Sequence, residues 1–347
     1  MVGRSVDRAI VTLAQKIFHA LADGDVHSGE ALADSTGVTR SAVWKVIEQL
    51  RDLGLDIEAQ TNRGYRLATP CEPLDARKIR AAMSSSLRAI TDVTIEWETE
   101  STNGALLAAS PPAVGRFVVL LAENQTGGRG RRGRMWRSAL GGSLCLSIAT
   151  SFEPLPRDLP ALTLVVGACV RDALRVLGAR DLLLKWPNDL VTRNASGEGA
   201  LIKLGGILVE LRAEAGGPGH VVIGIGLNLR LDDETTSTIA KSGTAAGDLH
   251  GQGIDVATRN TLAAAVMGRC IEGLLQFSKE GFSPFIAGWR AADALRDQPV
   301  RVFDGANERE GIARGIDSQG ALQLETADGR RTAIFGGEVS VRPRGTR

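Results

Sequence analysis

Apolar residues at the start of the chain recur at the spacing of one helix face. Val6, Ile10, Leu13, Ile17 and Leu21 keep this spacing of three to four residues. Because such a stripe can be buried while the opposite face stays in water, the pattern predicts a first amphipathic helix.

Two further helices are predicted next. Ser28 can cap a short helix that ends near Gly37, and Thr39 can cap a third helix that stops at Gly54. The third helix has an apolar face formed by Val43, Val46, Ile47 and Leu50.

A β-hairpin follows these helices. Its predicted strands are residues 56–58 and 65–67, and residues 61–64 supply the turn. Three helices followed by a hairpin is the pattern of a winged helix-turn-helix domain, which we assign to residues 1–69. Pro70 and Pro73 mark the linker behind it.

The rest of the chain mixes strands and helices and then becomes all-β. Predicted strands cover residues 118–122, 143–149, 182–185, 206–211 and 221–229, and predicted helices cover residues 162–177 and 262–277. Residues 74–296 are expected to form a central mixed α/β domain. Closely spaced turns in residues 299–341 predict a small β-barrel in residues 297–343. The expected fold class is α+β.

Composition narrows the possible functions. At 347 residues the chain is long enough for two or three domains, and its formal charge of +1 gives no global field for nucleic acid. No apolar run is long enough to span a membrane, and the N-terminus lacks the pattern of a signal peptide. The four cysteines show neither a CxxC pair nor metal-ligand spacing, so we expect free thiols, no metal site and a cytoplasmic location.

The most informative segment for chemistry is rich in glycine and arginine. Residues 127–136 read GGRGRRGRMW. Glycine lets the backbone approach a ligand closely, and arginine forks bind carboxylate or phosphate in bidentate fashion. Taken alone, the segment fits an oxyanion site, a solvated loop or an arginine-rich nucleic-acid tract equally well.

Three later segments favour a small-molecule site. Lys185 ends the apolar run 182–184 and precedes Trp186 and Pro187, and burying its ammonium is costly unless an anion meets it. The alternative is a lysine whose head reaches water at the strand end. Segments 203–210 and 224–228 resemble strands with glycines where a ligand or another backbone comes close. For either segment alone, a bulge or tight sheet packing is the alternative.

Taken together and in this order, these segments resemble the catalytic domain of biotin–protein ligases. The resemblance is carried by residues 100–103 (ESTN), 125–134 (QTGGRGRRGR), 185–189 (KWPND), 205–210 (GGILVE) and 224–228 (GIGLN). With a winged helix in front and a small barrel behind, the chain is similar to the bifunctional subclass that also represses biotin-synthesis genes. The resemblance implies a class II synthetase-like central domain and an SH3-like barrel.

The family implies a two-step reaction with ATP, biotin and Mg²⁺. Biotin carboxylate attacks the α-phosphate of ATP, and a lysine of a biotin carboxyl carrier protein then attacks the resulting biotinyl-adenylate. By matching positions, the implied catalytic residues are Lys185 and Arg131, and the implied biotin-binding residues are Ser101, Thr102, Asn103, Gln125, Arg129, Gly130, Arg131 and Lys185. The implied ATP or adenylate residues are Arg134, Trp136, Gly206 and Asn228.

The sequence departs from the family at the nucleotide. Arg137 follows Trp136 where some relatives have an aromatic residue, and residues 235–248 hold no tryptophan where relatives place a loop over the adenine. Both departures concern how the nucleotide packs and leave the reaction unchanged.

The predicted recognition helix has a polar face suited to DNA. Arg40, Ser41 and Lys45 lie opposite its apolar face, and Arg63 lies on the wing. Operator DNA and a homodimer promoted by the ligand are therefore expected partners, whereas a membrane is not. A winged helix used only for packing or protein contact is the alternative.

Three other functions remain open from the sequence. They are a transcription factor that senses biotin without catalysis, a lipoate or octanoate ligase, and an RNA-binding protein that uses the arginine-rich loop. Lys185 together with the arginines favours catalysis, because a sensor needs no cations for a phosphoryl-transfer transition state.

Overall fold

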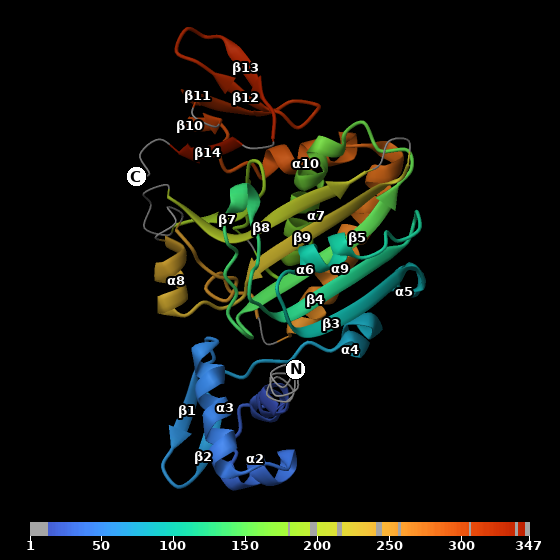
Figure 1. The fold of residues 1–347 in the computed structure, drawn as a ribbon. Coiled ribbons are helices and arrows are strands. Elements are labelled where there is room, and N and C mark those ends of the chain that lie inside the picture. Colours follow the sequence, from blue (N-terminus) through green and yellow to red (C-terminus); the bar gives the residue numbers. More distant parts are fainter. Residues whose placement is uncertain are drawn as a thin grey trace.

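The chain folds into a small N-terminal unit, a large central sheet covered by helices, and a C-terminal sheet (Figure 1). The computed structural model describes residues 13–179, 181–194, 200–213, 217–240, 245–255, 258–304, 307–336 and 339–343. No helix in these ranges is long and apolar enough to cross a membrane.

The N-terminal unit has the predicted winged-helix order. Residues 13–21 are helical, whereas Val6 and Ile10 lie outside the described residues. Helices α2 (Gly29–Thr36) and α3 (Arg40–Asp52) and the antiparallel strands β1 (Ile57–Gln60) and β2 (Gly64–Leu67) follow.

The predicted helix caps of this unit are present. The hydroxyl groups of Ser28 and Thr39 accept hydrogen bonds from the first turns of α2 and α3. The predicted apolar face of α3 is fully buried in the core of this unit, and Gly37 ends α2 in the left-handed conformation.

The central domain is built on a seven-stranded sheet in the order β3-β4-β5-β9-β8-β7-β6. All neighbouring strands are antiparallel except β3 and β4. The strands are β3 (Thr91–Thr99), β4 (Phe117–Gln125), β5 (Ser143–Phe152), β6 (Leu183–Lys185), β7 (Asp189–Arg193), β8 (Leu201–Arg212) and β9 (Gly219–Asn228).

The two faces of this sheet have different partners. On one face the long helices α7 (Leu162–Val176) and α9 (Arg259–Glu280) bury alternate residues of β4, β5 and β9 (Figure 1). On the other face the short helix α6 (Thr102–Ala108) packs on Leu120, Ala149 and Val222. Because side chains alternate along a strand, residues two apart share a face, and this rule decides which groups can meet beside α6.

Every predicted strand and helix of the central domain is present, with shifted ends. Strand β8 begins at Leu201 rather than residue 206, and α9 is longer than predicted at both ends. The sequence analysis missed β3, β7 and α6, and also the helices α4 (Ala76–Ala82), α5 (Ser85–Ile90), α8 (Asp233–Ala240) and α10 (Ile286–Ala291). Most of these are too short to show a clear period.

The C-terminal unit is a five-stranded antiparallel sheet in the order β13-β12-β11-β10-β14. Its strands are β10 (Pro299–Asp304), β11 (Asn307–Ile316), β12 (Leu322–Glu325), β13 (Arg331–Ile334) and β14 (Val339–Pro343). Its apolar side continues the core of the central domain, and the Trp186 indole donates a hydrogen bond to the Gly320 carbonyl.

A buried ion pair holds the linker between the first two units. The guanidinium of Arg259, at the start of α9, lies 2.9 Å from the Glu123 carboxylate of β4 and also binds the Glu72 carbonyl. Leu140, just behind the arginine-rich loop, packs in the core of the N-terminal unit and donates its N–H to the Leu53 carbonyl. The winged helix therefore rests directly on the central domain.

Candidate active site

A cavity of about 570 Å³ opens on the α6 face of the central sheet. It is bounded by the arginine-rich loop, the strands β5, β8 and β9, and the C-terminal strand β14. The structure brings all of the predicted ligand residues to this one cavity. They are Ser101, Thr102, Asn103, Gln125, Arg129, Gly130, Arg131, Arg134, Trp136, Lys185, Gly206 and Asn228.

Two glycines of strand β9 leave room for site side chains. A Cβ atom on Gly226 would lie 2.5 Å from the Trp136 ring, and one on Gly224 would lie 2.5 Å from the Asn103 side-chain oxygen. Real side chains do not come this close, so the glycines of segment 224–228 seat Trp136 and Asn103 against the sheet. Close approach is thus the observed role of these two glycines, although side chains of the same chain, and not a ligand or another backbone, come close.

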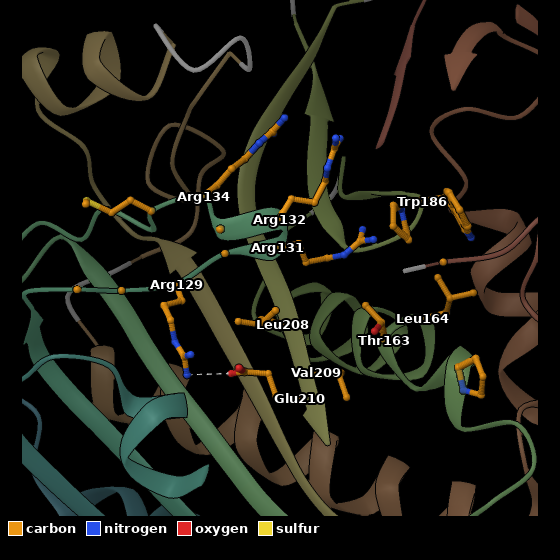
Figure 2. Close-up of a pocket in the computed structure, with 18 of the residues that line it drawn as sticks. Arg129, Arg131, Arg132, Arg134, Thr163, Leu164, Trp186, Leu208, Val209 and Glu210 are labelled. Atoms are coloured by element: carbon orange, nitrogen blue, oxygen red, sulfur yellow. Dashed lines mark hydrogen bonds and ion pairs between the residues drawn. The ribbon is translucent and has the colours of Figure 1, made fainter. Parts of the chain in front are cut away.

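Backbone hydrogen bonds close the arginine-rich loop into a turn. The N–H of Trp136 donates to the Gly128 carbonyl and the N–H of Gly130 donates to the Arg134 carbonyl, both at 2.7 Å. Figure 2 shows the loop lying above β8, with Arg129 directed to Glu210 and Arg132 and Arg134 pointing to the opposite side.

Arg131 ties the loop to two other parts of the site. Its guanidinium donates to the Asn188 side chain at 3.2 Å and to the Val339 carbonyl of β14 at 3.3 Å. A second cavity, of about 680 Å³, lies between this loop, β8 and the start of α7 (Figure 2). The loop therefore forms a wall that the two cavities share.

Lys185 and Lys203 flank the carboxylate of Asp189. Lys203 Nζ lies 2.6 Å from Asp189 Oδ1, and Lys185 Nζ lies 3.8 Å from Oδ2. Only 14% of the Lys185 side chain is exposed. Burial lowers the pKa of Lys185, and the cations Lys203, Arg134 and Arg342 lower it further, while Asp189 opposes them. An anion in the cavity would relieve this crowding of positive charge.

The cavity as a whole is strongly cationic. Among the described residues that line it, Asp189 is the one carboxylate. The positively charged lining residues are Arg129, Arg131, Arg132, Arg134, Arg137, Lys185, Lys203 and Arg342. Burial by itself would raise the pKa of Asp189, but the lysines outweigh it and hold the pKa below its ordinary value.

The end of the cavity beside α6 is lined mainly by uncharged polar side chains, and the Arg129–Glu210 ion pair lies next to them. The N–H and hydroxyl groups of Thr102 both donate to Gln125 Oε1, at 2.8 and 3.1 Å. The Asn103 amide donates to Glu210 at 2.8 Å. Beneath them, the hydroxyl of Ser147 on β5 lies 2.7 Å from the Thr102 hydroxyl and 2.6 Å from Asn103 Oδ1. This end can exchange hydrogen bonds with a neutral polar ring.

The nucleotide positions predicted from the sequence lie at the remaining wall. The Lys203 ammonium lies 6.0 Å from the centre of the Trp136 ring, and Asn228 donates to the Gly247 carbonyl at 2.9 Å. Thr238 and Ala245 also line the cavity. Segment 235–248, which has no tryptophan, thus reaches the site with smaller side chains, although residues 241–244 lie outside the described ranges.

The predicted DNA-contacting residues are all exposed. Arg40, Ser41 and Lys45 are exposed on α3, and Arg63 is exposed on the wing. Trp44, on the same polar side of α3, is 54% exposed. The face is therefore open to a large partner.

The curated protein relatives are similar over almost their whole length. The chain is 37% identical to the bifunctional ligase/repressor BirA of Salmonella typhimurium, over 95% of this chain and 98% of the relative. It is 36% identical to BirA of Escherichia coli over the same shares. The chain belongs to the biotin–protein ligase family.

Family models and a solved structure agree with the assignment of this chain to the biotin–protein ligases. Residues 101–228 match the biotin/lipoate A/B protein ligase family, residues 14–66 match a helix-turn-helix domain, and residues 297–342 match the C-terminal domain of biotin protein ligases. The biotin protein ligase of Aquifex aeolicus in complex with biotin and ATP superposes with a TM-score of 0.59 at 26% identity. The match covers 73% of this chain and 99% of that one. An RNA-binding protein, one of the alternatives from the sequence, is thereby set aside.

Several residues of the site were not predicted from the sequence, and Asp189, which lies between two lysines, is one of them. Lys203 and Arg342 line the cavity, while Ser147 and Glu210 bind residues that do. Glu210 stands four residues after Gly206, so strand alternation could have placed it on the cavity face. Lys203 stands three residues before Gly206, and a register shift in the pairing of β7 with β8 interrupts the simple alternation there. Ser147 and Arg342 carried no local signal.

Proposed function

We propose that this ligase activates biotin with ATP and attaches it to a lysine of a biotin carboxyl carrier protein. One observation carries the proposal: a single cavity has a hydrogen-bonding end that is mainly uncharged and a cationic end. The bicyclic ring of biotin carries a urea, which suits the first, and its carboxylate and the ATP phosphates suit the second. The four cysteines, all free thiols, support a cytoplasmic location.

In the first step, a carboxylate oxygen of biotin attacks the α-phosphorus of ATP. The bond to the β-phosphate oxygen breaks, and pyrophosphate leaves with its electron pair. Negative charge gathers on the α-phosphoryl oxygens, so cations held there in advance lower the barrier. We assign this role to Lys185 and Arg131 and add Lys203, which shares Asp189 with Lys185. Mg²⁺ would accompany ATP as part of the substrate, would offset phosphate charge and would need few protein ligands.

In the second step, the uncharged amine of the carrier lysine attacks the acyl carbon of biotinyl-adenylate. The bond from this carbon to the AMP phosphate oxygen breaks, an amide forms, and the amine loses its proton as AMP leaves. Because water would hydrolyse the same anhydride, the adenylate must be covered. The arginine-rich loop, with Arg129 and Arg131 bound to other elements, is suited to be this cover.

We further propose that the winged helix represses biotin-synthesis genes when biotinyl-adenylate is bound. The exposed face of α3 would enter a major groove, with Arg40, Ser41 and Lys45 at the DNA and Arg63 on the backbone. A homodimer promoted by the adenylate would place two such helices on successive half-sites. We also propose residues 1–69 as the limits of the winged-helix domain, residues 74–296 as those of the ligase domain and residues 297–343 as those of the C-terminal barrel.

The decisive experiment is ATP–pyrophosphate exchange measured in parallel with biotin, lipoate and octanoate. We expect exchange with biotin and none with the other two acids, which lack a urea. Equal exchange with biotin and lipoate would reject the assignment of substrate. A chain that shows no exchange with any acid but binds biotin would be a sensor, the main alternative to an enzyme.

A further inference from the structure

A continuous chain of hydrogen bonds runs beneath the end of the cavity beside α6. It joins Gln125 to Thr102, Thr102 to Ser147, Ser147 to Asn103 and Asn103 to Glu210. Glu210 also accepts from Arg129 of the arginine-rich loop at 3.3 Å. The chain thus crosses β4, α6, β5 and β8 and ends at the loop.

The chemistry of the partners determines the orientation of both amides. Asn103 Nδ2 faces the Glu210 carboxylate and the Leu208 carbonyl, which can only accept, so its oxygen must face Ser147. Gln125 faces the Thr102 N–H, which can only donate, so Gln125 Oε1 is turned to it. The Gln125 N–H groups then point away from Thr102.

These orientations decide where each hydroxyl proton goes. The Ser147 hydroxyl has one proton to donate. Because Asn103 Oδ1 can only accept a hydrogen bond, Ser147 donates its proton to Asn103. The Thr102 hydroxyl must then direct its own proton to Ser147 or Gln125, and it presents only a lone pair to the cavity. Ser101 accepts from the Gly104 N–H, which leaves its hydroxyl proton for a ligand.

We propose that Ser147 is a positioning residue that gives the ring end of the cavity its donor and acceptor pattern. Thr102 accepts, while Ser101 and Gln125 donate. A cyclic urea offers the complement, since its N–H groups donate and its carbonyl oxygen accepts two hydrogen bonds. Ser147 is 0% exposed and does not line the cavity, so it acts only through Thr102 and Asn103.

Asn103 takes a different role from the one that the sequence suggested. Both of its amide hydrogens are engaged, with Glu210 and with Leu208, and its oxygen receives Ser147. Asn103 is 4% exposed and joins the ring end to the arginine-rich loop through Glu210. We therefore place it beside Ser147 as a positioning residue.

The test compares Ser147→Ala with Ser151→Ala in ATP–pyrophosphate exchange. Ser151 is also buried on β5, on the same face of the strand, but its hydroxyl donates to the Pro112 carbonyl away from the cavity. Without Ser147, Asn103 Oδ1 loses its donor and the Thr102 hydroxyl is held by Gln125 alone, so the lone pair of Thr102 is less firmly directed at the ligand N–H. We expect the KM for biotin to rise about 10-fold, the effect of one lost hydrogen bond, with kcat and the KM for ATP nearly unchanged.

The control and a rescue separate positioning from mere stability. Ser151→Ala should lower the melting temperature without changing the KM for biotin, and Ser147→Thr, which keeps the hydroxyl, should restore a KM close to that of the unchanged protein. If the alanine variant does not fold, Ser147→Cys keeps the volume with a weaker donor and should raise the same KM. Equal KM values for biotin in Ser147→Ala and Ser151→Ala would overturn the proposal.

The inference rests on the proposed function, because it takes biotin as the ligand. The two fail in different ways. If the unchanged protein shows no exchange with biotin, the proposed function is wrong. If it is active and Ser147→Ala alters kcat and the KM for ATP as much as the KM for biotin, only the role of Ser147 is wrong.

Discussion

Lys185 and Lys203 reach one carboxylate from strands that are neighbours of β7. Lys203 is the more tightly paired with Asp189, and Lys185 is the more buried. The positive charge of a buried and weakly paired ammonium is stabilised most when negative charge builds up next to it, as it does in the transition state. We therefore expect Lys185→Ala to slow adenylate formation by about 100-fold or more in single-turnover measurements, with little change in melting temperature.

Lys203→Ala is the matched comparison for this prediction. It removes the second cation beside the same carboxylate and the cation above Trp136. A large loss in both variants would show that the two lysines share the charge of the transition state. Normal adenylation in Lys185→Ala with a large loss in Lys203→Ala would move the catalytic role to Lys203.

Asp293 is a buried carboxyl group beside strand β6, and one of its oxygens has no hydrogen-bond partner among the described residues. Burial raises its pKa to about 6, above the 3.8 of an unperturbed carboxyl group. The folded chain therefore binds this proton more tightly than the unfolded chain. Its contribution to stability is complete below about pH 3.8 and is lost as the pH rises through about 6.

Asp293→Asn should thus stabilise the protein at pH 7.5, by at most about 3 kcal/mol, since one pKa unit corresponds to about 1.4 kcal/mol. The amide oxygen can still accept the Leu295 N–H, which now binds Asp293 Oδ1. Melting temperatures at pH 7.5 and pH 5 provide the measurement. The gain should shrink at pH 5, and an equal gain at both values would contradict a buried charge as its cause.

At the scale of elements, the arginine-rich loop is held from two sides. Arg129 binds Glu210 of β8, and Arg131 binds Asn188 and the β14 backbone. Since β14 belongs to the C-terminal sheet, loop closure and the docking of that sheet are linked. Short backbone hydrogen bonds alone would not hold a glycine-rich segment closed against thermal motion.

Arg131→Ala should therefore loosen the loop and speed the release of biotinyl-adenylate while the fold is kept. Limited proteolysis with trypsin, which cleaves at the loop arginines, measures loop order with and without biotin plus ATP. We expect the ligands to protect the loop in the unchanged protein and to protect it less in the variant. An equal rate of cleavage with and without the ligands would show that the ligands do not order the loop.

At the scale of the whole molecule, the winged helix and the ligase domain share buried surface. Trp97 and Leu140 of the central domain lie in the core of the N-terminal unit, and the rings of Trp97 and Phe18 are 5.6 Å apart. Deleting residues 1–69 would expose both central-domain side chains to water. A deletion is thus a poor way to separate DNA binding from ligation.

The double variant Arg40→Ala, Lys45→Ala removes two exposed cations and leaves that shared surface intact. We expect it to lose binding to the promoter of the biotin-synthesis genes in gel-shift titrations. Its rate of biotin-dependent ATP–pyrophosphate exchange should stay unchanged. In the unchanged protein, binding should require biotin plus ATP. Binding without these ligands would contradict the adenylate as co-repressor, and no binding in either state would leave the winged helix as a protein-contact module.

Local signals were enough for the longer elements and for most of the cavity. The apolar period of α3, its cap at Thr39 and the order of five short motifs depend on neighbours in sequence, so they could be predicted without a structure. Short elements such as β7 and α6 were missed because a few residues show no reliable period. The ends of β8 and α9 were misplaced because partner strands and packing set them.

What the sequence by itself determined is the longer helices and strands, the family and the residue types available to the chemistry. Only the tertiary structure decided which groups meet. Ser147 looked like any polar residue of a strand until β5 came to lie beneath α6, and Lys203 gained its partner only when β7 paired with β8. The reason is physical: hydrogen bonds and ion pairs depend on distances in space, and those between remote segments arise only when strands pair and helices pack.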